Sequence, residues 1–223
     1  MIDLKALRNE QIKLRKKVKI YDEFEDITAV GGVDVAYSED FAYGACLVYN
    51  GQDITSYTIK RKIDFPYIPT YLAYREAPII IDLLKRVKKI DLLMVDGNGI
   101  LHPYRFGIAS HVGVLLDMPT IGIAKSLLCG REQRGKIMDG KEQIGYILHT
   151  KNRKVYISPG HKVSMESSLK IVKEIYSKIE LINEAHKLAN TVKKNDRPWR
   201  RETSAKSKSL SEFSNYKSKC LYP

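Results

Sequence analysis

The chain has 223 residues, 43% of them hydrophobic, which is enough for one well-buried α/β domain with a short terminal appendage. Its 38 lysines and arginines against 26 acidic residues give a formal net charge of +12, which favours nucleic acid as a partner, although a solvated basic surface would give the same charge. No apolar run approaches the ~18 residues needed to span a bilayer, and three widely separated cysteines indicate no disulfide framework, so we expect a soluble cytoplasmic protein with no membrane partner.

The N-terminal part predicts a helix followed by three strands. The first 20 residues lack the apolar core of an export signal and predict a charged helix. Strands are predicted over Thr28–Ala36, Tyr43–Tyr49 and Ile54–Ile63. The last two are joined at Asn50-Gly51, a pair that favours a hairpin turn. Together these strands predict an antiparallel β-meander.

Asp34 is the unusual residue of the first strand. Aspartate is depleted in strands, and an unpaired carboxylate inside a sheet is costly. Because side chains alternate along a strand, Val33 and Val35 point to one face, while Asp34 and Ala36 point to the other. Asp34 therefore needs a cation or a set of backbone donors, unless it is a structural turn residue.

Tyr67 lies in a short loop between Pro66 and Pro69, which restrict the backbone on either side of it. An ordinary proline turn with a packed tyrosine would explain this pattern. In a basic protein, a rigid aromatic side chain can also act as a wedge between bases.

The next segment, from Tyr71 to Lys89, has the apolar spacing of a helix, with Thr70 as its expected N-cap. Pro78 is expected to kink this helix or to begin a new one. Glu76 lies just before that point, and the helical pattern alone predicts that it faces solvent.

The segment from Leu92 to Ser126 gathers most of the polar side chains of interest. A buried strand over Leu92–Val95 leads into a turn at Gly97–Gly99, a helix begins at Gly107, and a second strand covers Thr120–Ala124. Four side chains of different chemistry follow the ends of these elements: Asp96, His102, Arg105 and Lys125. The ends of core strands are where α/β sheets usually place their chemistry.

The C-terminal part predicts two strands, two helices and a tail. The strands cover Gly145–Thr150 and Lys154–Ser158, and the helices begin at Ser164 and Asn183. From residue 195 the composition changes to lysine, arginine and serine with few aliphatic side chains. We therefore expect a folded domain over residues 1–194 and a basic, disordered tail over 195–223 that is available to phosphate.

Asp34 and Asp96 converge if the fourth strand adds parallel to the first. Carboxylates on two adjacent strands, with Glu76 on the intervening helix, match the layout of a ribonuclease H-like mixed sheet flanked by helices. Hard oxygen ligands of this kind suit Mg²⁺ and two-metal phosphodiester hydrolysis. In such a site Lys125 could neutralise phosphate charge, and His102 could assist proton transfer or hold water.

Four ordered motifs resemble endonuclease V: GGVDVAY (Gly31–Tyr37), PYIPTYLAYRE (Pro66–Glu76), VDGNGILHPYRFGIASHVGV (Val95–Val114) and GIAKS (Gly122–Ser126). The resemblance covers roughly residues 4–193. It implies a Mg²⁺-dependent repair nuclease of ribonuclease H-like fold, with Mn²⁺ as a conceivable substitute. Such an enzyme nicks DNA that contains deoxyinosine at the second phosphodiester bond on the 3′ side, leaving 3′-hydroxyl and 5′-phosphate ends.

The resemblance also implies roles for individual residues. The catalytic residues would be three metal-binding carboxylates and two groups that assist at the phosphate: Asp34, Glu76, Asp96, His102 and Lys125. The substrate would be bound by the wedge, by backbone groups that read the flipped base and by one arginine: Tyr67, Leu72, Gly97, Gly107, Ile108 and Arg105. His186 corresponds to a family position of His or Asp near the metals, and His161 is expected to be structural.

Three residues depart from the family pattern. Thr70 stands where many members have glycine, and Asn98 replaces a His or Gln. Tyr104 replaces the first arginine of an HPRR motif, a loss that would weaken backbone binding unless the basic tail offsets it. None of these changes removes an expected metal ligand.

Two other functions fit the same residues. Inosine-containing RNA could be the substrate, because the 2′-hydroxyl is sensed by local geometry that the sequence does not reveal. A non-catalytic nucleic-acid-binding protein could share the scaffold, although three converging carboxylates that repel phosphate argue against it. We expect a monomer.

Overall fold

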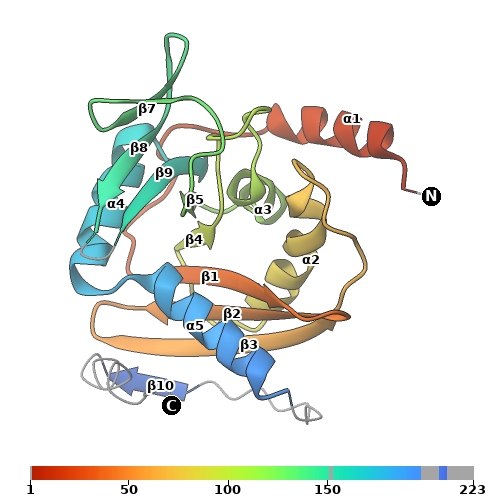
Figure 1. Ribbon diagram of the computed structural model, residues 1–223. Coiled ribbons are helices and arrows are strands. Elements are labelled where there is room, and N and C mark those ends of the chain that lie inside the picture. Colours follow the sequence, from red (N-terminus) through yellow and green to blue (C-terminus); the bar gives the residue numbers. More distant parts are fainter. Residues whose placement is uncertain (1, 151–152, 197–205, 210–223) are drawn as a thin grey trace.

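The computed structural model describes residues 2–150, 153–196 and 206–209. Within them lies one mixed sheet of ten strands, in the order β10-β3-β2-β1-β4-β5-β9-β8-β7-β6 (Figure 1). The strands are β1 Val30–Tyr37, β2 Phe41–Tyr49, β3 Asp53–Lys62, β4 Leu92–Asp96, β5 Thr120–Ala124, β6 Arg131–Gln133, β7 Lys136–Asp139, β8 Glu142–His149, β9 Lys154–His161 and β10 Lys206–Ser209. The helices are α1 Leu4–Arg15, α2 Leu72–Leu84, α3 Ile108–Leu116, α4 Met165–Lys178 and α5 Leu181–Lys194.

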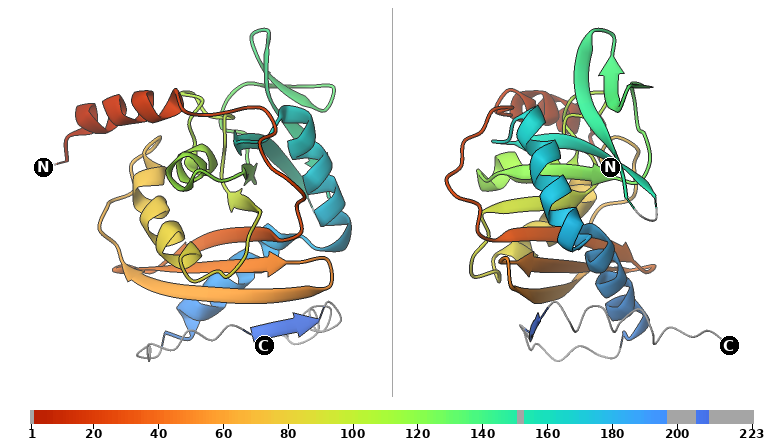
Figure 2. Two further views of the ribbon diagram at one scale, coloured as in Figure 1. Left: turned by 180° about the vertical axis from the view of Figure 1, so that it is seen from behind. Right: turned by 90° about the vertical axis from the view of Figure 1, so that its left-hand side faces the viewer.

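Helices cover both faces of the sheet, as Figure 2 shows from two further sides. On one face, apolar side chains of β1 and β2 pack with those of α2 and α3. On the other, side chains of β1, β4, β5 and β9 pack with those of α4 and α5. This arrangement confirms the predicted α/β class and the mixed sheet flanked by helices. No helix among the described residues is long and apolar enough to cross a membrane.

The predicted meander is confirmed. Strand β1 pairs antiparallel with β2, and β2 pairs antiparallel with β3. At the hairpin the Asn50 side chain accepts hydrogen bonds from the backbone of Gln52 and Asp53 (3.0 and 2.7 Å), and Gly51 has a φ of +95°. A left-handed backbone at this position favours glycine, so the turn chemistry fixes the register of the two strands.

The parallel fourth strand is also confirmed. Strand β4 pairs parallel with β1, with Val33 opposite Val95. At the other end of this pair the Asp91 carboxylate accepts hydrogen bonds from the backbone of Thr28 and Ala29, each at 2.8 Å. Asp34 and Asp96 follow the paired valines directly, so they occupy neighbouring positions, Asp34 within β1 and Asp96 at the end of β4.

The structure corrects the expected start of α2 and shows that it continues through Pro78. Its N-cap is Tyr71 and not Thr70, which has a left-handed φ of +69°. The helix also runs through Pro78 without a new helix beginning there, and it ends at Leu84. Burial of Ala77 and other apolar side chains against the sheet offsets the hydrogen bond that proline cannot make.

Strands β6 and β7 were not predicted from the sequence. They form a short hairpin with left-handed backbone at Arg134 (φ +49°) and Gly135 (φ +80°), which is typical of a tight two-residue turn. Most side chains of this hairpin are exposed, so no apolar alternation marks it in the sequence.

The predicted tail departs from expectation where it is described. The Asp196 carboxylate accepts hydrogen bonds from Lys60 Nζ (2.6 Å) and the Tyr43 hydroxyl (2.8 Å). Residues 206–209 form β10, which pairs antiparallel with the edge strand β3 instead of being disordered. The remaining tail, at 197–205 and 210–223, lies outside the described residues, and the domain boundary at 194 stays a prediction.

Candidate metal and nucleic-acid site

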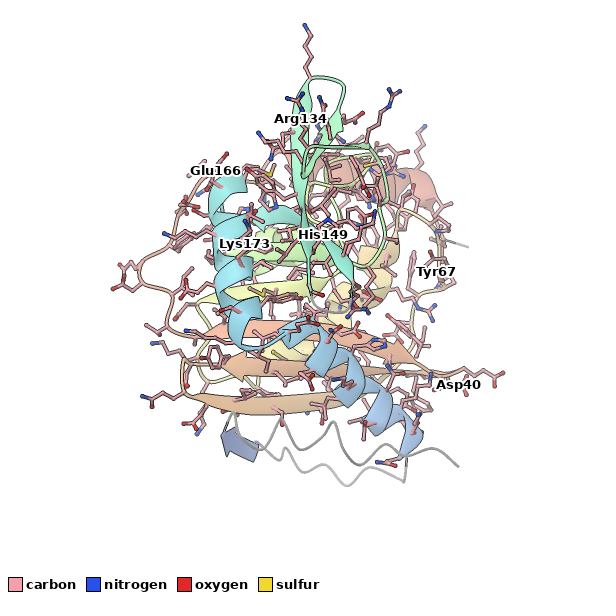
Figure 3. All side chains as sticks on the ribbon, turned by 60° about the vertical axis from the view of Figure 1, so that its left-hand side comes forward. Asp40, Tyr67, Arg134, His149, Glu166 and Lys173 are labelled. Atoms are coloured by element: carbon pink, nitrogen blue, oxygen red, sulfur yellow. The ribbon has the colours of Figure 1, made fainter. Side chains whose placement is uncertain are left out.

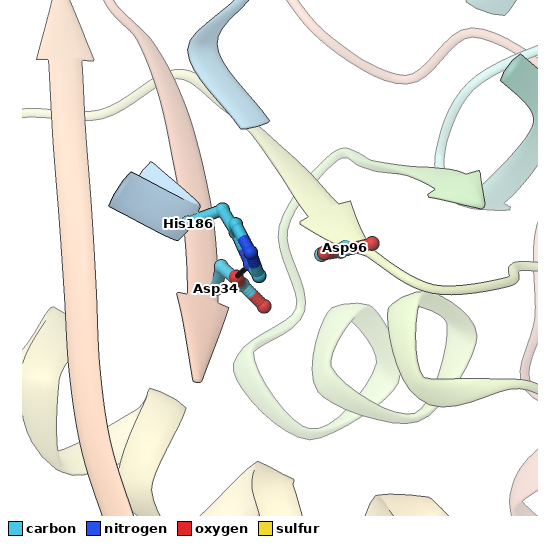
Figure 4. Close-up of side chains that lie close together, drawn as sticks. All are labelled: Asp34, Asp96 and His186. Atoms are coloured by element: carbon cyan, nitrogen blue, oxygen red, sulfur yellow. Dashed lines mark hydrogen bonds and ion pairs between the residues drawn. The ribbon is translucent and has the colours of Figure 1, made fainter. Parts of the chain in front are cut away.

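Three potential metal ligands meet where β1 continues past the carboxyl end of β4. Ligand atoms of Asp34, Asp96 and His186 all lie within 4.8 Å of one another (Figure 4). The carboxylates come from β1 and β4, and the imidazole comes from α5, which packs on the same face of β1. His186, whose place was uncertain from the sequence, thus completes the cluster.

The alternation of β1 explains why Asp34 reaches this position. Val33 and Val35 belong to the core beneath α2 and α3, whereas Ala36 packs with Ala189 of α5 on the opposite face. Asp34 shares that second face, and its Oδ2 lies 2.6 Å from Nδ1 of His186. The carboxylate therefore has the partner that its position in a strand requires.

Lys125 brings a positive charge to the cluster from the end of β5. Its Nζ forms an ion pair with Oδ2 of Asp96 and lies 3.4 Å from Nδ1 of His186. The Lys125 side chain remains 35% exposed, against 14% for the Asp96 side chain. The ammonium is therefore placed between a buried carboxylate and solvent, where an incoming phosphate can meet it.

Glu76 is close enough to the cluster for the charges of Asp34 and Asp96 to raise its pKa. Burial, followed by the charge of Asp34, raises the pKa of Glu76 to about 8, and Asp96 adds to this effect. Its Oε1 accepts a hydrogen bond from the Tyr37 hydroxyl (3.2 Å), which partly opposes the rise. Glu76 is thus not the solvated helical residue expected from its pattern, although it lies outside the 4.8 Å group.

The electrostatics of the cluster fit a divalent cation. Burial and the neighbouring Asp34 raise the pKa of Asp96 to about 6, even though Lys125 lowers it. Burial and the neighbouring carboxylates therefore disfavour the charged forms of Glu76 and Asp96. A hard dication relieves this repulsion, and carboxylate oxygens with one imidazole are suitable ligands for it.

His102 lies apart from the ion-pair cluster, in the loop between β4 and α3. Its Nδ1 accepts a hydrogen bond from the backbone of Tyr104 (3.2 Å). Burial lowers the pKa of His102 to about 4, and the charges of Arg8 and Arg105 contribute. The imidazole is therefore neutral at pH 7 and is suited to holding water or accepting a proton.

Arg105 is occupied by acidic partners. Its guanidinium donates to the carboxylates of Asp139 (2.5 Å) and Glu142 (2.9 Å) and to the carbonyl of His102 (3.0 Å). The Arg105 side chain is only 14% exposed. In this structure Arg105 joins the loop after β4 to the turn between β7 and β8, so the expected contact with substrate stays a prediction.

Glycines bring the expected base-reading segment close to the start of α3. A side chain at Gly107 would come within 2.2 Å of the carbonyl oxygen of Asn98, and one at Gly97 within 2.4 Å of the Ile108 side chain. The Ala109 amide donates to the carbonyl of Asn98 (3.1 Å). Three of the four expected base-reading positions thus lie together, while Leu72 begins α2, which packs beside α3.

His161 connects separate segments of the fold. Its Nδ1 accepts a hydrogen bond from the backbone of Lys19 (3.2 Å), and its Nε2 lies 3.5 Å from the Asp117 carboxylate. The side chain is almost fully buried. His161 pairs with Thr120 at the start of β5, at the opposite end of that strand from Lys125. These contacts are those of a packing residue.

Tyr67 is the most exposed large hydrophobic side chain of the described residues, at 66% (Figure 3). The loop that carries it is fastened to α1 by Gln11, which donates to the carbonyl of Thr70 (3.0 Å), and by Arg8, which donates to its hydroxyl (3.0 Å). A free aromatic ring therefore stands on an anchored loop.

Arg8 was not among the residues predicted from the sequence. It contacts two of the three residues that depart from the family pattern, Thr70 and Tyr104. Besides bonding Thr70, its guanidinium lies 3.5 Å from the ring centre of Tyr104 and 4.6 Å from that of Tyr71. A guanidinium from α1 thus occupies the neighbourhood in which Tyr104 replaces an arginine. No local pattern in α1 signals this role.

We expect Arg8→Ala to loosen the Tyr67 loop. The lost hydrogen bond and cation–π contacts are together worth about 1–3 kcal/mol, so local opening should become about 5- to 150-fold more frequent. Hydrogen exchange at the Tyr71 amide, which bonds the carbonyl of Ile68, reports this opening. The control is Arg15→Ala, at an exposed position of the same helix; equal exchange in both variants would contradict the anchoring role.

Comparisons with known proteins agree with this site. A family model described as Endonuclease V matches residues 12–190, a range that includes the whole cluster. The endonuclease V of Roseiflexus sp. (strain RS-1) is 41% identical over 183 residues, covering 76% of this chain and 82% of that protein. The crystal structure of endonuclease V from Streptomyces avermitilis is similar with a TM-score of 0.76 at 30% identity, over 87% of this chain and 94% of that one.

A second solved structure is similar to the same extent. An endonuclease V from Ciona intestinalis, in complex with a 24mer DNA containing an inosine followed by a ribo-adenosine, has a TM-score of 0.76 at 28% identity. The match covers 87% of this chain and 99% of that one. These likenesses confirm the expected ribonuclease H-like fold.

Proposed function

The chain belongs to the endonuclease V family, whose members are nucleases, and we propose that it nicks DNA beside deoxyinosine in a reaction that depends on Mg²⁺. The cut falls at the second phosphodiester bond on the 3′ side of the lesion and leaves 3′-hydroxyl and 5′-phosphate ends. The convergence of Asp34, Asp96 and His186 carries this proposal. The inosine-containing DNA bound by the Ciona relative supports the choice of substrate. The protein acts as a cytoplasmic monomer.

The cluster holds the metal through Asp34, Asp96 and Glu76, with His186 beside them. Held by these residues, Mg²⁺ would supply Lewis-acid polarisation of the scissile phosphate and a lower pKa for the attacking water, and Mn²⁺, which accepts the same ligands, would be able to replace it. Lys125 offers its ammonium to the phosphate from beside Asp96. His102 is buried and neutral at pH 7, and a neutral imidazole can hold a water molecule for the reaction.

Strand cleavage by the purified protein in Mg²⁺ tests this function. Matched oligonucleotides carry one deoxyinosine, one riboinosine or neither. We expect a nick only next to deoxyinosine. Cleavage only next to riboinosine would move the function to RNA, and binding without cleavage of any strand would favour a non-catalytic nucleic-acid-binding protein.

We propose that Tyr67 fills the gap left by the flipped base, because its ring is exposed on an anchored loop. Tyr67→Ala should lower the preference for deoxyinosine over adenine in kcat/KM by roughly tenfold to a hundredfold, the value of one base–aromatic stack. Tyr67→Phe keeps the ring and should keep the preference.

Tyr21→Ala removes another exposed tyrosine, 55% accessible and distant in sequence, and serves as the matched control. Unchanged selectivity in Tyr67→Ala would count against a wedge.

A further inference from the structure

The segment from Arg131 to Glu142, here called the basic hairpin, projects from the body of the protein (Figure 1, Figure 2). It comprises β6, β7 and the turn into β8. It carries four cations, Arg131, Arg134, Lys136 and Lys141. It also carries three acidic residues, Glu132, Asp139 and Glu142.

All three acidic residues of the basic hairpin are paired with cations outside it. Glu132 accepts from Lys154 Nζ and from the Tyr156 hydroxyl, each at 2.6 Å. Asp139 and Glu142 share the guanidinium of Arg105. Two cations outside the hairpin, Lys154 and Arg105, thus offset two of the three negative charges.

The four cations are left uncompensated. Each is an exposed residue, and none has an ion-pair partner among the described parts of the chain. Figure 3 shows Arg134 at the outer end of the hairpin. The segment thus presents four unpaired positive charges to solvent, against one net negative charge left on its three carboxylates and their two partners, and this surplus is the electrostatic complement of a phosphate backbone.

The basic hairpin is attached to the loop that follows Asp96, one of the residues of the metal cluster. Arg105 ties it to the loop that follows Asp96, and Leu101 of that loop packs with Ile137 and Ile144 in one apolar cluster. Arg131 follows Lys125 by six residues, so the two Cα atoms are at most about 21 Å apart. Successive phosphates of one strand are about 3.4 Å apart along the duplex axis, so this reach corresponds to roughly six nucleotides for Arg131. Arg134 follows Lys125 by nine residues, so its limit is about 31 Å, or roughly nine nucleotides.

We propose that the basic hairpin is a second binding site for the nucleic-acid backbone, contacting phosphates within about one helical turn of the cleaved bond. The contact is independent of sequence and of the lesion, because it is made by charge alone. This inference rests on the proposed function for the identity of the polyanion. The basic hairpin lengthens the segment of DNA that the protein contacts and takes no part in the chemical step.

The test compares the salt dependence of binding in two triple variants. One replaces Arg131, Arg134 and Lys136 with glutamine, and the other does the same to Lys170, Lys173 and Lys178, which are exposed on α4. Each is made with Asp96→Asn so that a 30-base-pair duplex carrying one deoxyinosine stays intact. We expect the hairpin variant to flatten the plot of log K against log salt by about 2 to 3, at about 0.9 per lost phosphate contact. The α4 variant should leave the slope unchanged.

Two further readouts separate this proposal from the proposed function. With Asp96 restored, the hairpin variant should nick at the wild-type rate when enzyme saturates the substrate, because the chemistry is intact. Arg131→Lys with Arg134→Lys should keep the wild-type slope, because the charge is kept. An unchanged slope in the hairpin variant, or an equal change in the α4 variant, would overturn the second site. Absence of nicking by the wild-type protein would instead overturn the proposed function, whatever the slope.

Discussion

Replacing Asp96 with asparagine is expected to abolish nicking while leaving DNA binding intact. Asp96 combines three features, since it is a proposed metal ligand, the partner of Lys125 and a neighbour of Asp34. Mutation of a residue that only hydrogen-bonds to a metal ligand typically lowers activity 10–100-fold. Loss of a ligand itself should therefore lower the nicking rate by roughly 10³-fold or more. Single-turnover cleavage of a deoxyinosine duplex measures the rate, and a binding isotherm on the same duplex measures affinity.

Affinity should be equal to that of the wild type or higher, because a carboxylate that repels phosphate has been removed. Asp53→Asn, at an exposed position at the start of β3, is the control and should nick normally. Cleavage by Asp96→Asn within tenfold of the wild-type rate would show that the cluster is not the catalytic centre.

Glu76→Gln is expected to abolish nicking and, in metal-free protein at high pH, to stabilise the fold. The pKa of Glu76 is raised in the folded protein to about 8, above its ordinary value of 4.5. The wild-type carboxyl group therefore contributes stability that is fully present below about pH 4.5 and is lost as the pH rises through about 8. Glutamine resembles the neutral acid and has no proton to lose, so the variant keeps this stability.

Melting temperatures in a chelator should thus agree near pH 5 and separate near pH 8.5, with the variant higher. A pKa change of this size corresponds to an upper limit on the order of 5 kcal/mol, and about 2 kcal/mol would shift the melting temperature by roughly 4–8 °C. Saturating Mg²⁺ should narrow the gap, because the cation stabilises the wild-type carboxylate. Superimposable melting profiles at both pH values would contradict the placement of Glu76 beside Asp34 and Asp96.

The convergence of Asp34 and Asp96 could be predicted from the sequence because it depends on local rules. The Asn50-Gly51 turn fixes the meander, and a parallel fourth strand follows from a single connecting helix. Strand alternation then places the Asp34 carboxylate on a known face. Each step uses neighbours in the chain or a common strand pairing.

His186, Arg8 and the partners of Arg105 could not be predicted in this way. His186 meets Asp34 across 152 positions in the sequence, through the packing of α5 on β1. Arg8 contributes through contacts with two aromatic rings that only the tertiary structure brings to it. The resemblance implied that Arg105 binds substrate, whereas its acidic partners come from β7 and β8, and no local pattern places them beside it.

The electrostatic environment of Glu76 also could not be predicted from the local sequence. Its helical pattern was that of a solvated glutamate, and only the resemblance to endonuclease V implied a role for it. Burial and two carboxylates from other elements give it a raised pKa, and neither effect is encoded near it in the chain. The sequence therefore predicts which residues carry chemistry better than it predicts the environment that tunes them.

The most direct test of the metal-dependent site is a Mg²⁺ titration of nicking, starting from chelator-treated protein and a duplex with one deoxyinosine. The position and the chemical ends of the nick are read at nucleotide resolution. We predict no cleavage without the ion and a saturable rise as Mg²⁺ is added. The single nick should fall at the second bond 3′ to the lesion, with a 3′-hydroxyl and a 5′-phosphate. Cleavage that persists in chelator at the same bond would contradict the assignment of Asp34, Asp96 and Glu76 as a metal-binding catalytic centre.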